Sequence, residues 1–568
     1  MHIDAVPNRG SRPTYLLRES IREGSRVFKR TLANLSALSE AQIEAMRAVL
    51  RGEQLAAVGK RFEVAGSLAH GHVQAVRVAM HRLGLPALLN ARASRERDLV
   101  CAMVAARVLA PHSKLATTRW WHTTTLAAEF GVSDAGEDDL YAAMDWLLER
   151  QGQVEKKLAL RHLRAGGLVL YDLSSSYFEG ECCPLARYGH NRDGKRGKLQ
   201  VNYGLVSAPG GCPVAVSVYE GNTSDAKTLL PQVQRVRSQF GIERLVIVGD
   251  RGMISHQAIG SLQGMEGIDW ITALKSTQIR TLLAAGALQM DLFDERNLAE
   301  LAHPEFPGER LVACRNPALA KLRAQKRQAL LQATVEALDK VRASVTAKRL
   351  RSPDDIGVRV GRVVNQYKMA KHIELTIGED RFEFRVREDS VAQEAALDGI
   401  YVLRTGLPAE RMDAPEVVRS YKSLSDAERA FRSLKTVDLK VRPIHHRLAG
   451  RVRSHIFLCM LAYYVEWHML QAWRELLFAD EDQEAKRTRD PVAPAKRSDL
   501  ARDKALTRTL PDSTPVHSFQ TLLCELSTIV RNTCRVPGSS NSAATFQVIT
   551  TANAKQRRAL DLPNAISV

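Results

Sequence analysis

The order in which strand-like and helix-like patterns follow one another between residues 167 and 275 constrains the fold more than any other feature. Three strands are expected first, and the second and third form a hairpin around Pro209-Gly210-Gly211. The successive patterns are the strands GLVLYDL, LQVNYGLVS and PVAVSVYEG, a helix near 225–240, the strand RLVIVGD, a helix near 254–263 and the strand DWITALK. This alternation predicts an α/β fold in which helices cover both faces of a mixed sheet.

Three strands, helix, strand, helix, strand is the order of a ribonuclease-H-like core. Residues from about 280 to 397 interrupt it with a basic, alanine-rich helix near 318–348 and the hairpin IELTIGEDRFEFRV, whose apolar residues alternate. The strand GIYVLRT and a helix near 415–437 then return to the core, and a long helix follows near 447–475.

Five segments are therefore predicted. They are an N-terminal hairpin plus helical, DNA-binding domain (1–165), the first part of the ribonuclease-H-like core (166–280), an α+β insertion (281–397), the second part of the core (398–478), and a charged linker with a helical tail (479–568).

The N-terminal segment has two local signals of its own. The stretch TYLLRESIREGSRVFKRTL indicates two strands around Glu23-Gly24, and Ser39 with Gln42 forms a capping box before a helix. Residues 126–147 have the outline of a helix-turn-helix. The second helix would open with three acidic residues facing phosphates, so a packing helix pair is the better interpretation.

Net charge points to a polyanionic partner. Eighty-one Lys and Arg residues against sixty-three Asp and Glu give +18 at pH 7, and each phosphate neutralised by Lys or Arg releases condensed counterions. The eight cysteines form no CxxC pair, which argues against a zinc ribbon. The longest apolar run, Ile456 to Val465, is too short to span a bilayer, and the N-terminus has no apolar signal region. We expect a cytoplasmic, nucleoid-associated protein with no membrane partner.

Two aspartates occupy equivalent positions in this pattern. Asp172 ends the strand LVLYDL, and Asp250 ends LVIVGD. Sites in open α/β sheets lie outside the strand ends, so these two carboxylates can converge. Asp250 is followed by Arg251-Gly252, where a glycine allows a ligand to approach the backbone. The alternative for each aspartate alone is a turn cap.

A third carboxylate comes from YKSLSDAERAFRSLK. Tyr421, Glu428 and Lys435 are spaced seven residues apart, and seven residues of α-helix rotate about 700°, which leaves them near one line. A solvated charged face is the alternative. Three carboxylates suit Mg²⁺, and two such ions activate the attacking oxygen and stabilise the leaving oxygen in phosphoryl transfer. His445, His446 and His455 lie among arginines and are interpreted as phosphate contacts or helix surface.

These motifs together resemble bacterial insertion-sequence transposases of the DDE type. The branch is the one with a Tyr-x2-Arg-x3-Glu-x6-Lys signature and a β-rich insertion before the glutamate. The resemblance covers most of residues 12–475 and is carried by YDLSSSYFEG, EGNTSDAKTL, VIVGDRGM and YKSLSDAERAFRSLKTVDLKVRPIHHR.

The resemblance implies that Asp172, Asp250 and Glu428 are the catalytic, metal-binding triad. Two Mg²⁺ ions, for which Mn²⁺ could substitute, would support cleavage at the element's ends and strand transfer of the 3′-hydroxyl in a cut-and-paste pathway. Double-stranded DNA and a second copy of the chain, in a synaptic homodimer, are the implied partners. The phosphate-binding set would comprise Tyr421, Lys435, Arg432, Arg251 and Arg442. The signature arginine is replaced by Leu424, and Arg432, one turn after Glu428, is the candidate to replace it.

Other interpretations remain open from the sequence. Asp193 and Asp225 are possible substitutes in the triad, although Asp225 opens a helix and is more easily explained as its cap. A different ribonuclease-H-like nuclease is disfavoured by the long insertion between Asp250 and Glu428. A catalytically inactive, transposase-derived DNA-binding regulator is disfavoured by the intact triad and kept open by Leu424.

Overall fold

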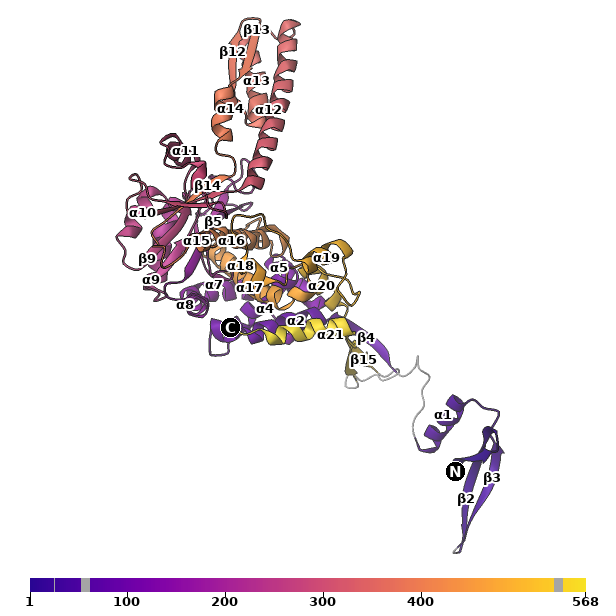
Figure 1. The fold of residues 1–568 in the computed structure, drawn as a ribbon. Helices are drawn as coiled ribbons and strands as arrows, with labels where there is room; N and C mark the ends of the chain where they lie inside the picture. The colour runs from indigo at the N-terminus through magenta and orange to yellow at the C-terminus, as the bar shows by residue number, and fades with distance from the viewer. Residues whose placement is uncertain (25, 53–61, 536–544) are drawn as a thin grey trace. The chain divides into compact units, whose positions relative to one another are not determined.

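The computed structural model describes residues 1–24, 26–52, 62–535 and 545–568 (Figure 1). These residues form two compact units. One comprises Met1–Leu68 with Val530–Thr551, and the other comprises Ala69–Ile529 with Ala552–Val568. Each unit is therefore built from two separate stretches of the sequence.

The smaller unit consists of two small sheets and a helix. The strand pair expected around Glu23-Gly24 is confirmed as β2 (Ser11–Glu23) and β3 (Arg26–Asn34), and β1 (His2–Asn8), which was not predicted, pairs with β2. The capping box of Ser39 and Gln42 is confirmed at the start of α1 (Glu40–Leu50). The second sheet contains β4 (Glu63–Ala69), β15 (Val530–Arg535) and β16 (Thr545–Ile549).

Seven helices precede the large sheet. They are α2 (Gly71–Arg82), α3 (Leu85–Leu89), α4 (Arg95–Leu109), α5 (Lys114–Trp120), α6 (Leu126–Glu129), α7 (Glu137–Glu149) and α8 (Gln151–His162). α7 buries Leu140, Met144 and Leu147 and packs against α4, as expected for a packing helix rather than a recognition helix. These helices share one hydrophobic core with half of the large sheet.

The predicted order of elements in the large sheet is confirmed. The strands β5 (Leu168–Tyr177), β6 (Gln200–Ser207), β7 (Pro213–Glu220), β8 (Leu245–Val248) and β9 (Ile268–Ala273) are separated by α9 (Ala226–Ser238) and α10 (His256–Gln263). β5 pairs in parallel with β8, and β8 with β9, whereas β6 and β7 continue the sheet in antiparallel register. The protein is thus a mixed α/β protein with a large mixed sheet.

Three further strands extend this sheet beyond β9. They are β14 (Ile400–Thr405), β11 (Arg310–Arg315) and β10 (Leu298–Leu301), all antiparallel to their neighbours. β14 was predicted. β10 and β11 were not, although Pro307-Gly308 between them is a turn signal. Part of the segment read as an interruption therefore belongs to the sheet, and α11 (Ser276–Ala284) precedes those strands.

The rest of that segment forms its own hydrophobic cluster. α12 (Pro317–Thr346) and α13 (Pro353–Tyr367) pack with the hairpin of β12 (Ile373–Gly378) and β13 (Arg381–Val386), and α14 (Glu388–Ala395) follows (Figure 1). The hairpin register pairs Ile377 with Phe382, as the alternation of apolar residues predicted.

Apart from β15 and β16, the regular elements described after β14 are helices. They include α15 (Ala414–Lys422), α16 (Leu424–Arg432), a π-helical turn (Ser433–Val437), α17 (Ala449–Ala472), α18 (Gln483–Thr488), α19 (Asp499–Thr507), α20 (Phe519–Ser527) and α21 (Ala554–Asp561). α17 is buried on all sides, as expected for a core helix. Among the described residues, no single helix is long and apolar enough to cross a membrane, and one bent pair, Arg95–Leu109 with Lys114–Thr123, passes that test by length and composition only.

Residues 479–515, expected to be a mobile linker, instead make specific buried contacts. Val492 is buried in the cluster beneath β14, and its carbonyl accepts a 2.9 Å hydrogen bond from Asn316. Lys504 is 2% exposed and donates to the carbonyls of Arg474, Glu475 and Leu477. The many charges of this segment misled the sequence interpretation, because several of them are paired.

A buried ion pair joins β14 to the loop before β11. Arg404 and Glu309 have side chains that are each 4% exposed, and Arg404 Nε donates to Glu309 Oε2 at 2.6 Å. Replacing Arg404 by Met should lower the free energy of unfolding by about 3–5 kcal/mol, because a buried carboxylate loses its partner. Thermal unfolding measures the loss. The double variant Arg404→Met/Glu309→Leu should recover most of it, and a double variant as unstable as the single one would contradict this explanation.

Candidate active site

The parallel register of β5 and β8 places two aspartates at the same level of the sheet. Leu170 on β5 is the partner of Val248 on β8. Asp172 and Asp250 each follow two residues later. The equivalence expected from the sequence thus has a direct basis in strand register.

Asp172 does not end its strand, however. β5 continues to Tyr177 through pairing with β6, in which Asp172 is opposite Leu205. The serines at 174–176 are buried strand residues rather than the expected turn, and Ser176 Oγ lies 2.9 Å from the Tyr203 hydroxyl. Asp172 therefore lies where β5 extends beyond β8, so its carboxylate stands beside the open end of the shorter strand.

Glu428 is carried by α16, which packs against β5. A single helix was expected from 415 to 437, but it is interrupted at Ser423 between α15 and α16 and changes to a π-helical turn at Ser433. The alignment of Tyr421, Glu428 and Lys435 assumed one uninterrupted α-helix, which the structure does not contain. Glu428 is exposed, with its carboxylate on the open side of α16.

The three carboxylates interact electrostatically. Burial raises the pKa of Asp172 to about 6, the charges of Glu428 and Asp250 add to the increase, and a hydrogen bond from the Leu173 backbone opposes it. That N–H donates to Asp172 Oδ1 at 2.8 Å. Two neighbouring negative charges disfavour the ionised form of a third carboxylate, and a cation bound among them would reverse that effect.

Tyr421 on α15 faces the same group of charges. Burial raises the pKa of its hydroxyl to about 12, and the charges of Asp250, Glu428 and Asp172 contribute, while Arg251 opposes them. The structure therefore brings Tyr421 to the triad even though the helix is broken. Arg251 and Arg432 are exposed, and neither side chain has a hydrogen bond or ion pair with the described part of the chain.

Leu424, which stands in the place of the signature arginine, is a packing residue. It is half-buried against the apolar cluster beneath β14, next to Tyr421. Its side chain supports α16 from the side of the sheet. Arginine at this position would have to leave that cluster.

Comparison with known proteins adds independent evidence. The family model "Transposase DDE domain" matches residues 181–465, half of the chain. The chain therefore belongs to the DDE transposase family. A second model, "IS1634 family transposase, N-terminal domain", matches residues 3–59. The DDE match includes Asp250 and Glu428 but begins after Asp172. The inclusion of Asp172 in the candidate site therefore depends on strand register and electrostatics alone.

Among solved structures, the transposase is similar to the chain described as "Cryo-EM structure of piggyBac transposase synaptic complex with hairpin DNA". The identity is 9%, the TM-score is 0.34, and the alignment covers 78% of this chain and 85% of that one. Among curated proteins there is no match.

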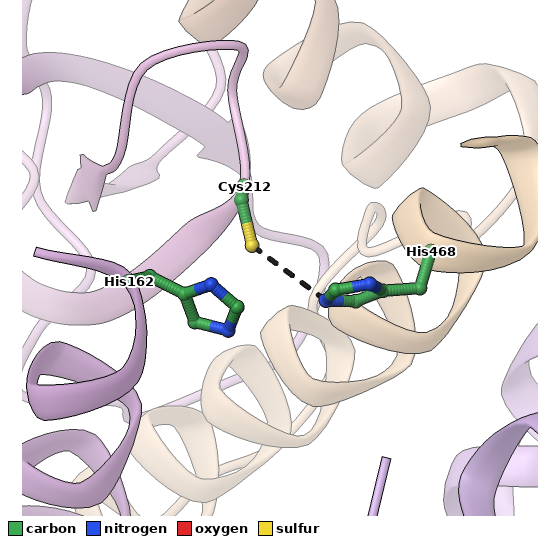
Figure 2. Close-up of side chains that lie close together, drawn as sticks. All are labelled: His162, Cys212 and His468. Atoms are coloured by element: carbon green, nitrogen blue, oxygen red, sulfur yellow. Dashed lines mark hydrogen bonds between the residues drawn. The ribbon is translucent and has the colours of Figure 1, made fainter. Parts of the chain in front are cut away.

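A group of nitrogen and sulfur ligands lies elsewhere in the transposase. His162, Cys212 and His468 approach from α8, the β6–β7 turn and α17, with ligand atoms within 4.8 Å of one another (Figure 2). Burial lowers the pKa of His162 to about 4 and of His468 to about 3, and raises that of Cys212. His162 Nε2 already lies 3.0 Å from the Tyr464 hydroxyl. These three side chains are therefore interpreted as neutral packing groups that are separate from the site of Asp172, Asp250 and Glu428.

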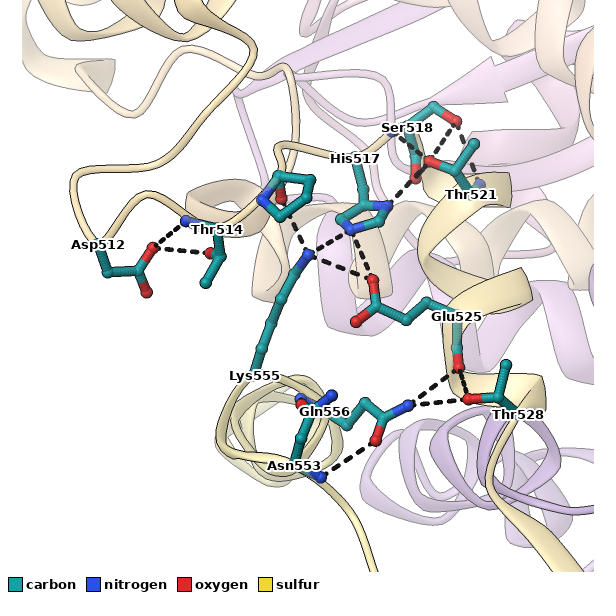
Figure 3. Close-up of polar contacts among 11 residues, drawn as sticks. Asp512, Thr514, His517, Ser518, Thr521, Glu525, Thr528, Asn553, Lys555 and Gln556 are labelled. Atoms are coloured by element: carbon teal, nitrogen blue, oxygen red, sulfur yellow. Dashed lines mark hydrogen bonds and ion pairs between the residues drawn. The ribbon is translucent and has the colours of Figure 1, made fainter.

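A second polar cluster holds the C-terminal helix in place. Lys555 on α21 lies 3.2 Å from Glu525 Oε2 on α20 and donates to the carbonyl of Pro515 at 3.0 Å (Figure 3). His517 lies 2.7 Å from the same carboxylate oxygen. Gln556 adds hydrogen bonds to Glu525 O and Thr528. The cluster is internally paired and is interpreted as structural.

Sequence reasoning missed the role of Asp193, which it considered only as a substitute in the triad. The Asp193 side chain is 2% exposed, accepts from Tyr177 N and from Lys435 Nζ at 3.0 Å each, and pairs with Arg442. Two predicted phosphate ligands are therefore anchored on one buried carboxylate. Asp225, the other substitute, pairs with Arg192, and its side chain makes no capping hydrogen bond, which corrects the expected cap.

Replacing Asp193 by Asn should destabilise the transposase. The amide can still accept from Tyr177 N, but Lys435 and Arg442 lose their counter-charge, at a cost of about 3–5 kcal/mol. Asp225→Asn is the matched control. Its carboxylate is 37% exposed, so the loss of one pair there should cost under about 1 kcal/mol. Thermal unfolding of both variants tests this, and equal losses would contradict the assignment of burial as the cause.

Proposed function

We propose that this protein is the DNA transposase of an insertion sequence, which cleaves DNA at the element's ends and joins the 3′-hydroxyl to a target. The observation that carries the proposal is the convergence of three carboxylates: Asp172 and Asp250 at one level of parallel strands, and Glu428 close enough for its charge to act on Asp172. Membership in the DDE family supports the same reaction class.

We further propose that the large sheet contains a ribonuclease-H-like core. The strand order β7-β6-β5-β8-β9, with β5, β8 and β9 parallel, supports it. In this interpretation β10, β11 and β14 extend the core, and the cluster of α12, α13, β12 and β13 is the insertion before the glutamate. The segment boundaries predicted at residues 165, 280, 397 and 478 stay predictions.

Mg²⁺ is the proposed cofactor, with Mn²⁺ as a substitute. Oxygen ligands from one or two carboxylates plus substrate phosphates are what Mg²⁺ prefers, and Asp172, Asp250 and Glu428 supply such oxygens. The raised pKa of Asp172 fits this role, because added positive charge would favour its ionised form. When bound, two such ions supply Lewis-acid stabilisation of the attacking and leaving oxygens.

The chain's own residues would position the scissile phosphate. Arg251 and Arg432 are exposed beside Asp250 and Glu428, respectively, and are available to bind phosphate oxygens. Tyr421 stays protonated well above neutral pH and can donate its hydroxyl hydrogen to a phosphate oxygen. Lys435 and Arg442 add positive charge from their anchor on Asp193.

Double-stranded DNA, as element ends and target, is the proposed partner, and a net charge of +18 favours it. A homodimer is proposed because two ends must be held together for joining. The proposed place of action is the nucleoid.

Substitution of the triad tests the proposal. Asp172→Asn, Asp250→Asn and Glu428→Gln should each abolish Mg²⁺-dependent cleavage of DNA that carries the inverted repeats flanking the gene, because each removes a cation ligand while DNA binding is retained. Glu243→Gln is the matched control, since Glu243 is an exposed carboxylate at the opposite end of β8. Gel assays of cleavage and of end binding measure both properties, and full cleavage by any triad variant removes that residue from the triad.

Strand transfer separates transposition from simple hydrolysis. Pre-cleaved element ends incubated with supercoiled plasmid and Mg²⁺ should become joined to the plasmid by the unmodified protein. Cleavage without joining would identify another nuclease of this fold. Binding with neither reaction would identify a DNA-binding regulator.

The two exposed arginines give a second test. Arg251→Gln and Arg432→Gln should each weaken end binding and reduce the slope of log Kobs against log[salt] by about 0.9, the value for one phosphate contact on B-form DNA. Arg349→Gln, an exposed arginine after α12, is the control and should leave the slope unchanged. Fluorescence anisotropy over a salt series measures the slope, and unchanged slopes in both variants would exclude these contacts.

A further inference from the structure

A large cavity lies beside the predicted phosphate-binding residues and is not part of the carboxylate site. Its volume is about 690 Å³. Its walls come from the end of α4, the segment 111–114, α7, the loop 440–448 and the start of α17. Cavities of 300–1,000 Å³ are typical of small-molecule sites, so a whole nucleotide fits this one by size.

The lining is cationic and contains no carboxylate. Six lysines and arginines and four histidines line it: Arg107, Lys114, Lys440, Arg442, Arg447, Arg451, His112, His445, His446 and His455. Arg442 and Arg451 have carboxylate partners, Asp193 and Asp145, outside the lining. The cavity is therefore positively charged on several sides at once, which focuses the potential for an anion.

Lys114 is the least compensated of these cations. It is 5% exposed, and its ammonium has no hydrogen bond or ion pair with any residue in the part of the chain that the structure describes. Lys504, which is buried to a similar degree, has three backbone carbonyls and Glu481 as partners. Burial, followed by the charge of Arg107, lowers the pKa of Lys114 to about 7. An unpartnered buried ammonium carries a desolvation cost that a bound anion would offset.

The pKa values of the cavity's histidines reflect burial and the positive charge of the neighbouring lysine and arginine. Burial, followed by the charges of Lys114 and Arg107, lowers the pKa of His446 to about 3. His455 is 6% exposed, and its Nδ1 has no hydrogen-bond partner among the described residues, whereas its Nε2 lies 3.2 Å from the Val441 carbonyl. Two atoms of buried side chains, Lys114 Nζ and His455 Nδ1, therefore line one cavity without a hydrogen-bond partner among the described residues.

The cavity is coupled to the strand that carries Asp172. The loop 440–448 pairs with the end of β5, where Ile444 N donates to Tyr177 O at 3.2 Å and Glu179 N donates to Ile444 O at 2.9 Å. Arg442, on the same loop, shares the Asp193 carboxylate with Lys435. A group bound in the cavity would thus contact the loop 440–448, which is hydrogen-bonded to the end of β5.

We propose that this cavity binds the phosphate of one nucleotide of the DNA that the transposase processes, with Lys114 and Arg107 at its inner wall. Tyr141 lines the same cavity and holds Arg451 over its ring, 4.5 Å from the centroid. The assignment of DNA rests on the proposed function, whereas the assignment of phosphate rests on the cavity alone.

Thermal unfolding of the full-length protein tests the phosphate assignment. Inorganic phosphate and thymidine 5′-monophosphate should raise the unfolding temperature by about 2 °C or more relative to chloride at equal ionic strength, because they bind only the folded state. Lys114→Met should abolish this increase while the variant without ligand is as stable as the parent or more stable. Lys504→Met, the matched buried lysine, should start less stable and keep the increase. A full increase in Lys114→Met would overturn the proposal.

A second variant guards against misfolding of the first. Arg447 is exposed at the cavity, so Arg447→Gln should fold normally and lose part of the phosphate effect. An unchanged phosphate effect in this variant, together with an unfolded Lys114→Met protein, would also overturn the proposal.

The source of the phosphate is decided with oligonucleotides. Lys114→Met should weaken binding of duplex element-end DNA by about tenfold, the effect of one lost charged hydrogen bond. If phosphate stabilises the parent but DNA affinity is equal in both proteins, the ligand is a free phosphate compound and the DNA assignment is wrong. This readout is binding alone, so loss of cleavage in the triad variants, or its absence in the parent, does not affect it.

Discussion

The parallel pairing of β5 with β8 is the constraint on which the candidate site depends. Leu170 opposite Val248 fixes Asp172 and Asp250 at one level, and a slip of one residue would turn either side chain to the other face of the sheet. Because β8 ends at Val248 while β5 continues to Tyr177, the sheet leaves an opening beside Asp172. The extension of β5 also pairs with β6 and the loop 440–448, so the strand that bears the first acid is held on both sides.

Much of this arrangement follows from local sequence patterns. The apolar runs of the sequence predicted the order of β5 to β9. An aspartate at the end of each of two such runs predicted two of the three carboxylates of the site, Asp172 and Asp250. Glu428 could not be located that way. Its seven-residue spacing from Tyr421 and Lys435 assumed a straight helix, and tertiary packing replaced it with two helices and a π-helical turn. π-helical turns are rare in proteins overall, and those that occur are often at functional sites. No residue pattern at 433–437 predicted this one.

What the sequence could not predict is how its charges are paired. Asp193 meets Lys435 across 242 positions of the chain, and Lys504 finds its carbonyls near residues 474–477. Such pairs depend on how distant segments are brought together, whereas composition shows only that the segments are charged. The same limit explains why the charged segment after residue 479 was expected to be a linker, and why the sequence pattern does not distinguish Lys114, the first residue of the short helix α5.

The buried cations of this protein consequently fall into two kinds. Lys504, Lys435 and Arg442 have carboxylate or carbonyl partners, so their charges are offset within the chain and hold segments together. Burial lowers the pKa of Lys435, and the Asp193 carboxylate opposes that decrease. Among the described residues Lys114 has no carboxylate or carbonyl partner, so no hydrogen bond or ion pair there offsets its desolvation. Selection for stability alone would favour an apolar residue there, because replacing an uncompensated buried charge by a hydrophobic side chain of similar volume removes a cost. A bound ligand of opposite sign would offset that cost and favour the charged form of Lys114.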